Sequence, residues 1–537
     1  MDLPSEDTAA RTAAAGRGPT ADGPLTAPRP PVAWRALGAL AAAVAALLVA
    51  VSGRYGYHRD ELYFVAAGRH LAFGYPDQPP LTPLLARAAT ELFGDSLVGL
   101  RLASALATAL VVLVSGLIAR ELGGGRGPQM LAAGCVAVSA FVLAVGHLLS
   151  TSTFDLLIWT VLSWLVVRAL RDGGRVWLAV GLVAGIGLQN KTLVAFLLAG
   201  LVVGVLVAGP RATLRSPWPW AAAGIALLLW VPNLLWQAVH GWPQLELSTA
   251  IAAGSSISSQ PRWLFLPIQL VLVSPLLVPV WVAGWWRLTR DPGLRTYRAF
   301  AVAYPLLAAV FLVTGGKPYY LFGLYPVLLA AGAEPTLRWV RAGALGTAPA
   351  AVIGRWGVRR APGARRVLLG VVIGLSAVMS AVLMLPLVPV GQLAATPIVD
   401  IHPDAGETVG WPAFARTVAG VHAGLPSADR DGLVVLTRNY GQAGAVDRYG
   451  PELGLPQAFS GHNSYAEWGP PPGSAGVTLV IGYDRGRLER WFGSVEEAAR
   501  IDNGVGLDND EQGTSVWVCR QRLVPWAELW PQLRRIG

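Results

Sequence analysis

Residues 97–119 read LVGLRLASALATALVVLVSGLIA, a run in which Arg101 is the single charged side chain. A helix that crosses a bilayer needs about 17–25 residues of low polarity, so this run predicts one transmembrane helix. Ten further apolar runs surround it, at 33–52, 128–149, 154–170, 176–190, 192–208, 218–239, 263–286, 298–314, 319–335 and 367–390. Two of these runs, 176–190 and 319–335, are short, and we expect them to be tilted or broken. The pattern predicts an all-α polytopic membrane domain over residues 32–390 with about 11 transmembrane helices.

The composition excludes several other classes of protein. The chain has 537 residues, of which 53% are hydrophobic and 14% charged, whereas soluble proteins carry about 25% charged residues. An ordinary soluble enzyme is therefore excluded, and the abundance of Trp, Leu and Val excludes a disordered or fibrous chain. Two cysteines, Cys135 and Cys519, cannot form a disulfide framework.

The two ends of the chain differ from its apolar part. Residues 1–31 have no apolar periodicity and predict a disordered cytoplasmic tail. Residues 391–537 carry a net charge of −5, against +15 for the rest of the chain. Short apolar runs separated by turn residues predict a small extracytoplasmic α/β domain there, with strands at 433–436, 477–481 and 515–518 and helices at 439–449 and 495–501.

The distribution of basic residues predicts how the chain is oriented. If the N-terminus is cytoplasmic, the loops on the inner side hold 18 arginines, whereas the short outer loops after the first hold only Lys191, Arg262 and Lys317. Positive charge favours the cytoplasmic side of a membrane. We therefore expect a multi-pass protein of the plasma membrane, and eleven spans place the C-terminal domain on the extracytoplasmic side.

The first outer loop, 53–96, is long and carries amphipathic sequence. From residue 81 onward its apolar side chains recur at helical spacing, which predicts a helix that lies in the membrane interface and does not cross it. Residues 60–73 predict a second helix of this kind. The apolar face of the first helix consists of Leu81, Leu84, Leu85, Ala88 and Leu92.

Three acidic residues of the outer side are candidate catalytic groups. Asp60 and Glu61 follow the first span, and Asp155 stands at the start of the fourth. Carboxylates at membrane depth are costly and usually face a cavity or a partner. Each acid also has an explanation without catalysis. Asp155 could stabilise the N-terminus of its helix through the helix dipole, and Asp60 could form a salt bridge with Arg59 or Arg54.

The two lysines of the chain are candidate phosphate-binding groups. The chain contains 40 arginines but only two lysines, Lys191 and Lys317, and both lysines lie at outer ends of predicted spans. A compact ammonium suits a phosphate, although a lysine at a membrane interface also extends its charge into water without any such role. Together with the acids, these cations predict an outer-surface site for an anionic amphiphile and a hydroxyl-bearing second substrate, whose proton a carboxylate accepts.

Several motifs in this order resemble one family. The sequence 57–64, YHRDELYF, and 74–81, GYPDQPPL, resemble the first outer loop of family 39-type GT-C glycosyltransferases. This group includes protein O-mannosyltransferases and the aminoarabinose transferases of lipid A. The resemblance covers residues 50–335 and includes Phe154-Asp155, Asn190-Lys191, Gly316-Lys317-Pro318-Tyr319-Tyr320 and Tyr325-Pro326. In the C-terminal domain, Thr437–Gln442 and Ser460–Asn463 look like segments of bacterial members whose role is open.

The resemblance implies an inverting glycosyltransferase of the GT-C fold, which uses a polyprenyl-phosphate-linked sugar on the extracytoplasmic face. Asp60 would be the general base, with Glu61 beside it and Asp155 as the second acid. The residues expected around the lipid phosphate and the sugar are Lys191, Lys317, Tyr319, Tyr320, His58, Asp77 and Gln78.

The acceptor could be a cell-envelope glycan, lipid or protein, but the large inserted luminal domain of protein mannosyltransferases is missing, which counts against a protein. His58 and the nearby acids match no recognised metal-ligand spacing, so no metal or other cofactor is predicted. We expect contacts with membrane lipids and none with nucleic acid, because the positive charge is divided among the inner loops.

Two other functions fit a polytopic chain. A transporter or flippase for a lipid-linked glycan would show paired repeats about a midplane site, and the sequence shows no repeat. An inactive scaffold whose C-terminal domain binds a cell-wall polymer would not need Asp60, Asp155 and both lysines.

Overall fold

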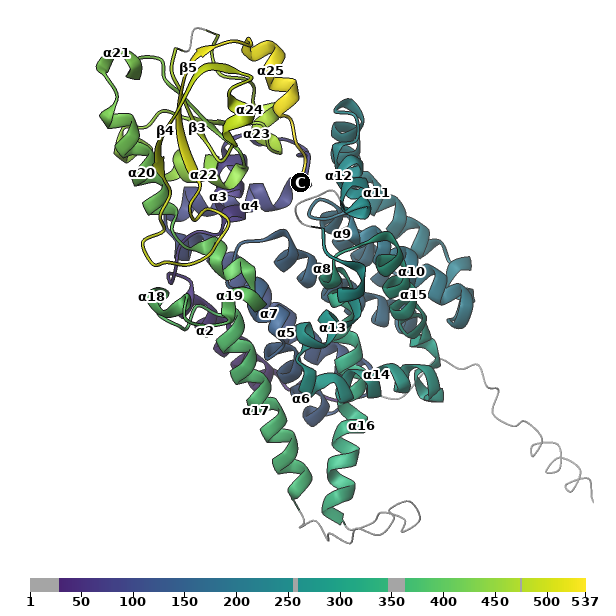
Figure 1. The fold of residues 1–537 in the computed structure, drawn as a ribbon. Helices are drawn as coiled ribbons and strands as arrows, with labels where there is room; N and C mark the ends of the chain where they lie inside the picture. Colours follow the sequence, from purple (N-terminus) through teal and green to yellow (C-terminus); the bar gives the residue numbers. More distant parts are fainter. Residues whose placement is uncertain (1–28, 255–258, 346–362, 474–475) are drawn as a thin grey trace, which may run out of the picture.

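The fold is that of a helical membrane domain joined to a small C-terminal domain, in a computed structural model that describes residues 29–254, 259–345, 363–473 and 476–537 (Figure 1). Nearly all of the tail predicted over residues 1–31 lies outside the described residues. The apolar helices are α2 (Trp34–Val51), α5 (Leu97–Glu121), α6 (Arg126–Ala137), α7 (Ala140–Gly146), α8 (Thr151–Asp172), α9 (Val176–Leu188), α10 (Leu193–Ala208), α11 (Pro217–Val239), α13 (Phe265–Val273), α14 (Val278–Arg290), α15 (Arg298–Thr314), α16 (Tyr325–Leu345) and α17 (Ala364–Met384).

All eleven predicted spans fall on helices, which confirms a multi-pass membrane protein. Among the described residues, six helices are long and apolar enough to cross a membrane, or up to eight if each bent pair is one span. The runs 128–149 and 263–286, each predicted as one span, are formed by pairs of helices that bend by 62° and 83°. Pro275, which has no N–H to donate, follows Ser274 at the second bend.

Two short helices precede the second predicted span. They are α3 (Arg59–Arg69) and α4 (Leu81–Phe93), and they confirm the helices expected in the first outer loop. The face of α4 that packs on the protein contains Thr82, Pro83, Ala86 and Ala89. Its predicted apolar face is open, with Leu84 exposed by 49% and Leu92 by 75%. This arrangement suits an interfacial helix, because the open leucines can enter the lipid.

The C-terminal domain is built on a five-stranded sheet with the order β2-β1-β3-β5-β4. The strands β1 (Val434–Thr437), β2 (Ala458–Ser460) and β3 (Thr478–Ile481) are parallel to one another. The strands β5 (Ser515–Arg522) and β4 (Phe492–Arg500) extend the sheet antiparallel. Helices α20 (Trp411–Gly424), α22 (Tyr440–Tyr449) and α25 (Trp526–Leu533) pack around this sheet. The predicted α/β domain with its three strands and first helix is thereby confirmed.

The second predicted helix of this domain, 495–501, is wrong. Residues 495–500 belong to β4, which pairs with β5 from Phe492↔Arg522 to Arg500↔Ser515. The local sequence VEEAAR favours a helix, but a strand at the edge of the sheet forms its hydrogen bonds with β5, and tertiary pairing overrides local preference.

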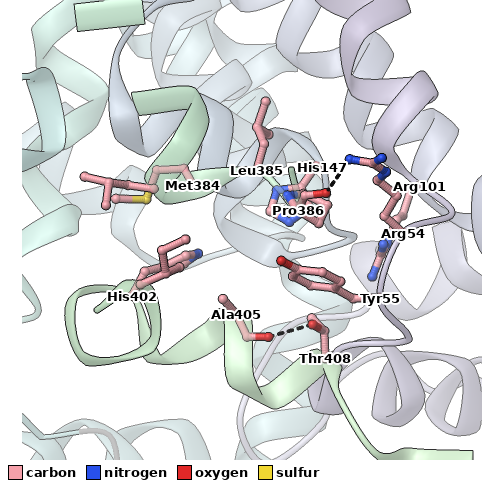
Figure 2. Close-up of a pocket in the computed structure, with 12 residues that line it drawn as sticks. Arg54, Tyr55, Arg101, His147, Met384, Leu385, Pro386, His402, Ala405 and Thr408 are labelled. Atoms are coloured by element: carbon pink, nitrogen blue, oxygen red, sulfur yellow. Dashed lines mark hydrogen bonds between the residues drawn. The ribbon is translucent and has the colours of Figure 1, made fainter. Parts of the chain in front are cut away.

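The last apolar helix returns to the start of the first outer loop, where it anchors the C-terminal domain. Arg54 Nη1 donates to the carbonyl of Pro386 at 3.1 Å, and Tyr55 OH donates to the carbonyl of Val388 at 2.8 Å. Figure 2 shows the pocket at this joint, where Arg54, Tyr55 and His402 surround a cavity of about 10 Å³. This volume suits about one water molecule, so the joint is structural and too small for a sugar or a lipid.

Helices α3 and α22 pack unusually closely. A Cβ added at Gly444 would lie 2.8 Å from the Cβ of Leu62, and one added at Gly441 would lie 2.8 Å from the Cβ of Arg59. Glycine is therefore required on this face of α22 for the two helices to approach. The contact fixes the C-terminal domain against the first outer loop.

Replacing Gly444 with valine should separate the two helices. Overpacking of this kind costs about 1–3 kcal/mol of unfolding free energy, which thermal unfolding of the detergent-solubilised protein measures. The matched control is Gly420→Val on α20, where an added Cβ meets nothing within 4 Å. Equal stability of the two variants would contradict the close packing of α3 and α22.

Candidate active site

The first turn of α3 presents the motif His58-Arg59-Asp60-Glu61. His58 Nδ1 accepts from the Asp60 backbone N–H at 3.2 Å, and Glu61 Oε2 accepts from the His58 N–H at 2.8 Å. These reciprocal bonds form a capping box, which satisfies backbone donors that a helix start leaves unpaired. The motif thereby fixes the position of Asp60, whose side chain remains 38% exposed.

Glu61 has a fully occupied carboxylate. Its Oε1 accepts from Arg101 Nε at 2.9 Å and from the Leu149 N–H at 2.8 Å. Its Oε2 accepts from Arg101 Nη2 at 2.7 Å in addition to His58. Arg101 also donates to the carbonyls of Ser52 and Gly56. Because the Glu61–Arg101 pair is buried and also bonds to the backbone that follows α2 and that precedes α8, the geometry favours a positioning role for Glu61 over the predicted catalytic role.

Asp60 receives a hydrogen bond from the C-terminal domain. Tyr440 OH donates to Asp60 Oδ1 at 2.7 Å. Burial alone would raise the pKa of Asp60, but His58, Arg59, the Tyr440 hydrogen bond and Lys317 together hold it below its usual value. The carboxylate is therefore ionised at neutral pH, which is the state that a general base needs.

Asp77 and Gln78 lie in the segment that connects α3 to α4. Asp77 Oδ1 accepts from Tyr63 OH at 2.6 Å, and the same hydroxyl lies 2.6 Å from Ser464 Oγ. Burial raises the pKa of Asp77 to about 7. The amide of Gln78 is buried and has no hydrogen-bond partner among the described residues. A buried amide without a partner is costly, so Gln78 offers a donor and an acceptor to a bound ligand.

The two lysines converge on one pair of aromatic rings. Lys191 Nζ lies 5.1 and 5.2 Å from the ring centroids of Tyr319 and Tyr320, and Lys317 Nζ lies 5.9 Å from that of Tyr319. Lys191 Nζ also donates to Ser152 Oγ at 3.3 Å. Within the described ranges, neither ammonium has a carboxylate oxygen within 4.0 Å. Two unpaired cations on one aromatic surface form a site suited to an anion.

Asp155 and Asp60 each interact electrostatically with one of these two lysines. Asp155 is 9% exposed in the first turns of α8, and its Oδ1 has no hydrogen-bond partner among the described residues. Lys191 is close enough to attract Asp155 electrostatically, and Lys317 acts in the same way on Asp60. The structure thus brings Asp60, Asp155, Lys191 and Lys317 into one region, as the sequence predicted.

The C-terminal domain supplies residues that sequence reasoning missed. The ring of Tyr440 packs against that of Tyr63 in a tilted arrangement with centroids 4.8 Å apart, and the ring of His462 lies 4.7 Å from that of Tyr440. Both residues belong to the two segments whose role was open. No sequence signal indicates that Tyr440 meets Asp60, because 380 positions separate them.

The hydroxyl of Tyr440 has a testable effect on the ionisation of Asp60. Its hydrogen bond is one of the interactions that lower the Asp60 pKa, so Tyr440→Phe should raise that pKa. A base with a raised pKa stays protonated to higher pH, and the acid limb of the pH–rate profile should move upward. Tyr483→Phe, in the same domain, is the control that should leave the limb in place. An unmoved limb in Tyr440→Phe would show that another group titrates there.

A metal would find few ligands in this region. His58 Nε2 lies 3.9 Å from Asp404 Oδ1, and no third His, Cys, Asp or Glu joins them among the residues that the structure describes.

Known proteins are similar to this chain in sequence and in fold. A family model described as dolichyl-phosphate-mannose-protein mannosyltransferase matches residues 77–236. The undecaprenyl phosphate-alpha-4-amino-4-deoxy-L-arabinose arabinosyl transferase 2 of Pseudomonas fluorescens (strain Pf0-1) is 29% identical over 266 residues, which make up 45% of this chain and 46% of that protein. The crystal structure of apo ArnT from Cupriavidus metallidurans matches with a TM-score of 0.53 at 15% identity, over 89% of this chain and 97% of that chain.

The chain has a GT-C fold. The same ArnT bound to undecaprenyl phosphate gives a TM-score of 0.51 at 16% identity. The GT-C resemblance predicted from the motifs is confirmed, and so is the combination of a polytopic helical domain with a small α/β domain. In sequence, the chain spans about half the length of the curated relatives that it matches.

Proposed function

We propose that this GT-C chain is an inverting glycosyltransferase, which transfers a sugar from a polyprenyl-phosphate-linked donor to a hydroxyl of a cell-envelope acceptor. The observation that carries the proposal is the pair of unpaired lysines on Tyr319 and Tyr320, in one region with the ionised Asp60. The names of the relatives support it, because they are transferases of an undecaprenyl-phosphate-linked sugar. The ArnT structure that contains undecaprenyl phosphate supports the lipid phosphate.

In the proposed reaction, Asp60 acts on the acceptor, and the two lysines act on the phosphate of the donor. Asp60 accepts the proton of the acceptor hydroxyl, whose oxygen forms a bond to the anomeric carbon of the donor. The bond from that carbon to the phosphate oxygen breaks, and the polyprenyl phosphate leaves with the electron pair. Lys191 and Lys317 stabilise the charge that grows on the phosphate. Attack opposite the leaving group inverts the anomeric carbon. Asp155, the acidic residue of the second outer loop, interacts electrostatically with Lys191 and helps to hold that ammonium in place.

The proposed orientation places this chemistry on the extracytoplasmic side, with the N-terminus in the cytoplasm. Glu121, at the end of α5, accepts a salt bridge from Arg29 at 2.8 Å and lies within 4.0 Å of Arg120, Arg168 and Arg171. These arginines come from loops assigned to the inner side, so the basic loops gather at one place. The C-terminal domain contacts the loop assigned to the outer side, which supports the same assignment.

The experiment is a transfer assay with the purified full-length chain. Undecaprenyl-phosphate-linked sugars carrying a radiolabel are supplied with membrane extracts as acceptor, and a new labelled glycoside is sought. Formation of that product with release of undecaprenyl phosphate supports the proposal. Movement of intact donor across a sealed vesicle, without cleavage, would establish the flippase alternative, which gains no support from the site or from the named relatives.

A further inference from the structure

A cleft outside the site described above lies between the C-terminal end of α3 and the C-terminal domain. Its volume is about 350 Å³, which falls in the range of small-ligand sites. Arg69 and His70 line it from α3, and Asp447, Gln457 and Trp468 line it from the C-terminal domain. The close packing of α22 on α3 holds the two walls together.

The groups in this cleft have the chemistry of a carbohydrate site. The rings of His70 and Trp468 stack with centroids 4.3 Å apart, and this aromatic pair forms part of the wall of the cleft. Asp447 is held in place, since its carboxylate accepts from the Ala458 N–H at 2.9 Å and from Tyr465 OH at 2.8 Å. Its carboxylate and the Gln457 amide can still bond to hydroxyl groups.

Arg69 adds a positive charge to the cleft, and it acts electrostatically on Asp447 of the opposite wall. Its side chain is exposed, and it has no hydrogen bond and no carboxylate oxygen within 4.0 Å among the residues that the structure describes. An exposed guanidinium that makes neither a close ion pair nor a hydrogen bond suits a phosphate or a carboxylate of a ligand. The cleft therefore fits a hydroxylated ring that stands next to a negative charge.

The position of the cleft relates it to the proposed reaction. Arg69 follows Asp60 by nine positions on α3, which places it about 14 Å away along the helix. Just beyond α3, Leu71 is 53% and Phe73 is 65% exposed. These side chains suit a membrane surface, so the cleft opens near the level of lipid head groups and on the same helix as the base.

We propose that this cleft binds the acceptor through a sugar or polyol ring that carries a phosphate or carboxylate group, while another hydroxyl of the acceptor reaches Asp60. The inference rests on the proposed function, and it names the recognition element of the acceptor. The shared chemistry is a polyhydroxylated ring beside an anion, carried either by a lipid or by a soluble glycan.

The test is binding of inositol 1-phosphate and glucose 1-phosphate to the full-length chain in phosphatidylcholine nanodiscs, measured by calorimetry without any donor. Arg69→Ala should weaken binding about tenfold, because it removes a charged hydrogen-bond partner. Gln457→Ala, a second exposed position, should weaken it less. Arg490→Ala, which removes an exposed arginine elsewhere in the same domain, should change nothing.

Nanodiscs with added phosphatidylinositol distinguish the two sources of the ligand. If the lipid competes with inositol 1-phosphate, a lipid head group is the ligand, and if it does not, a soluble glycan is. Absence of binding by any of these probes, or equal binding by Arg69→Ala and the unaltered chain, would overturn the proposal. The assay contains no donor, so it measures binding independently of sugar transfer. If the chain binds these probes but never transfers sugar, the proposed function fails and the cleft remains a binding site. If it transfers sugar but binds none of the probes, only the proposal about the cleft fails.

Discussion

Replacing Asp60 with asparagine should lower sugar transfer about a hundred- to ten-thousandfold, the usual contribution of a general base. The amide keeps the shape of the side chain and can still accept the hydrogen bond from Tyr440, but it cannot accept a proton. The fold should be retained, since the Asp60 carboxylate is partly exposed and the capping box uses only its backbone N–H. The measurement is the rate of labelled product formation at saturating donor.

The matched control is Asp95→Asn, in the same outer loop and 63% exposed. It removes a carboxylate whose nearest recorded cation is Arg448 at 3.8 Å, so transfer should stay near that of the unaltered chain. Binding of undecaprenyl phosphate should survive in both variants, because the lysines are intact. Near-normal turnover by Asp60→Asn would reject Asp60 as the base and leave Asp77 as the next candidate, since its pKa is raised to about 7.

The fold was largely predictable because a membrane-spanning helix requires a long run of apolar residues, and such runs can be read from the sequence. Each predicted run is helical, since the bilayer leaves the backbone no partner other than itself. The bends were not predictable at the same level. Ser274 adopts φ +94° before Pro275, and its hydroxyl bonds to Ser376 of α17 at 2.9 Å. That contact joins residues about a hundred positions apart, so the hydropathy of the sequence cannot predict it.

The candidate site was predictable only in part. The loop motifs indicated Asp60, Asp155 and both lysines, because charged residues next to the ends of predicted spans are easy to identify in a chain this apolar. The motifs could not separate Asp60 from its neighbour. One residue changes the direction of a helical side chain by about 100°, and this turns Glu61 inward to Arg101 while Asp60 stays partly exposed. Tyr440 was missed because only the folded chain brings it to α3.

The topology of the C-terminal sheet explains why Tyr440 arrives there. In α/β sheets, ligands bind beyond the carboxyl ends of the parallel strands. Here α22 begins directly after β1, with Asn439 as its cap, and His462 follows β2. The edge of the sheet that would hold a ligand in a separate α/β protein is therefore turned toward the first turn of α3. The C-terminal domain supplies part of the site, and it is more than a cover over it.

Replacing Lys191 or Lys317 with methionine should weaken binding of undecaprenyl phosphate about ten- to hundredfold, since each removes a charged partner of the phosphate. Methionine keeps the length of the apolar part of the side chain, so packing on Tyr319 and Tyr320 should survive. The measurement is the dissociation constant for a shortened polyprenyl phosphate in detergent. Transfer should also slow at saturating donor, because the cations act on the charge that grows as the phosphate departs.

Lys→Arg variants test whether charge or compactness matters. An arginine restores the charge but needs a planar, forked partner, so partial recovery of binding would favour a simple charge role. Arg262→Met is the control, because this arginine lies at another outer helix end and donates to the carbonyl of Ala252 at 3.2 Å. Unchanged binding in both lysine variants would show that the phosphate does not bind at Tyr319 and Tyr320. A loss confined to one variant would assign the phosphate to that lysine and leave the other to the sugar.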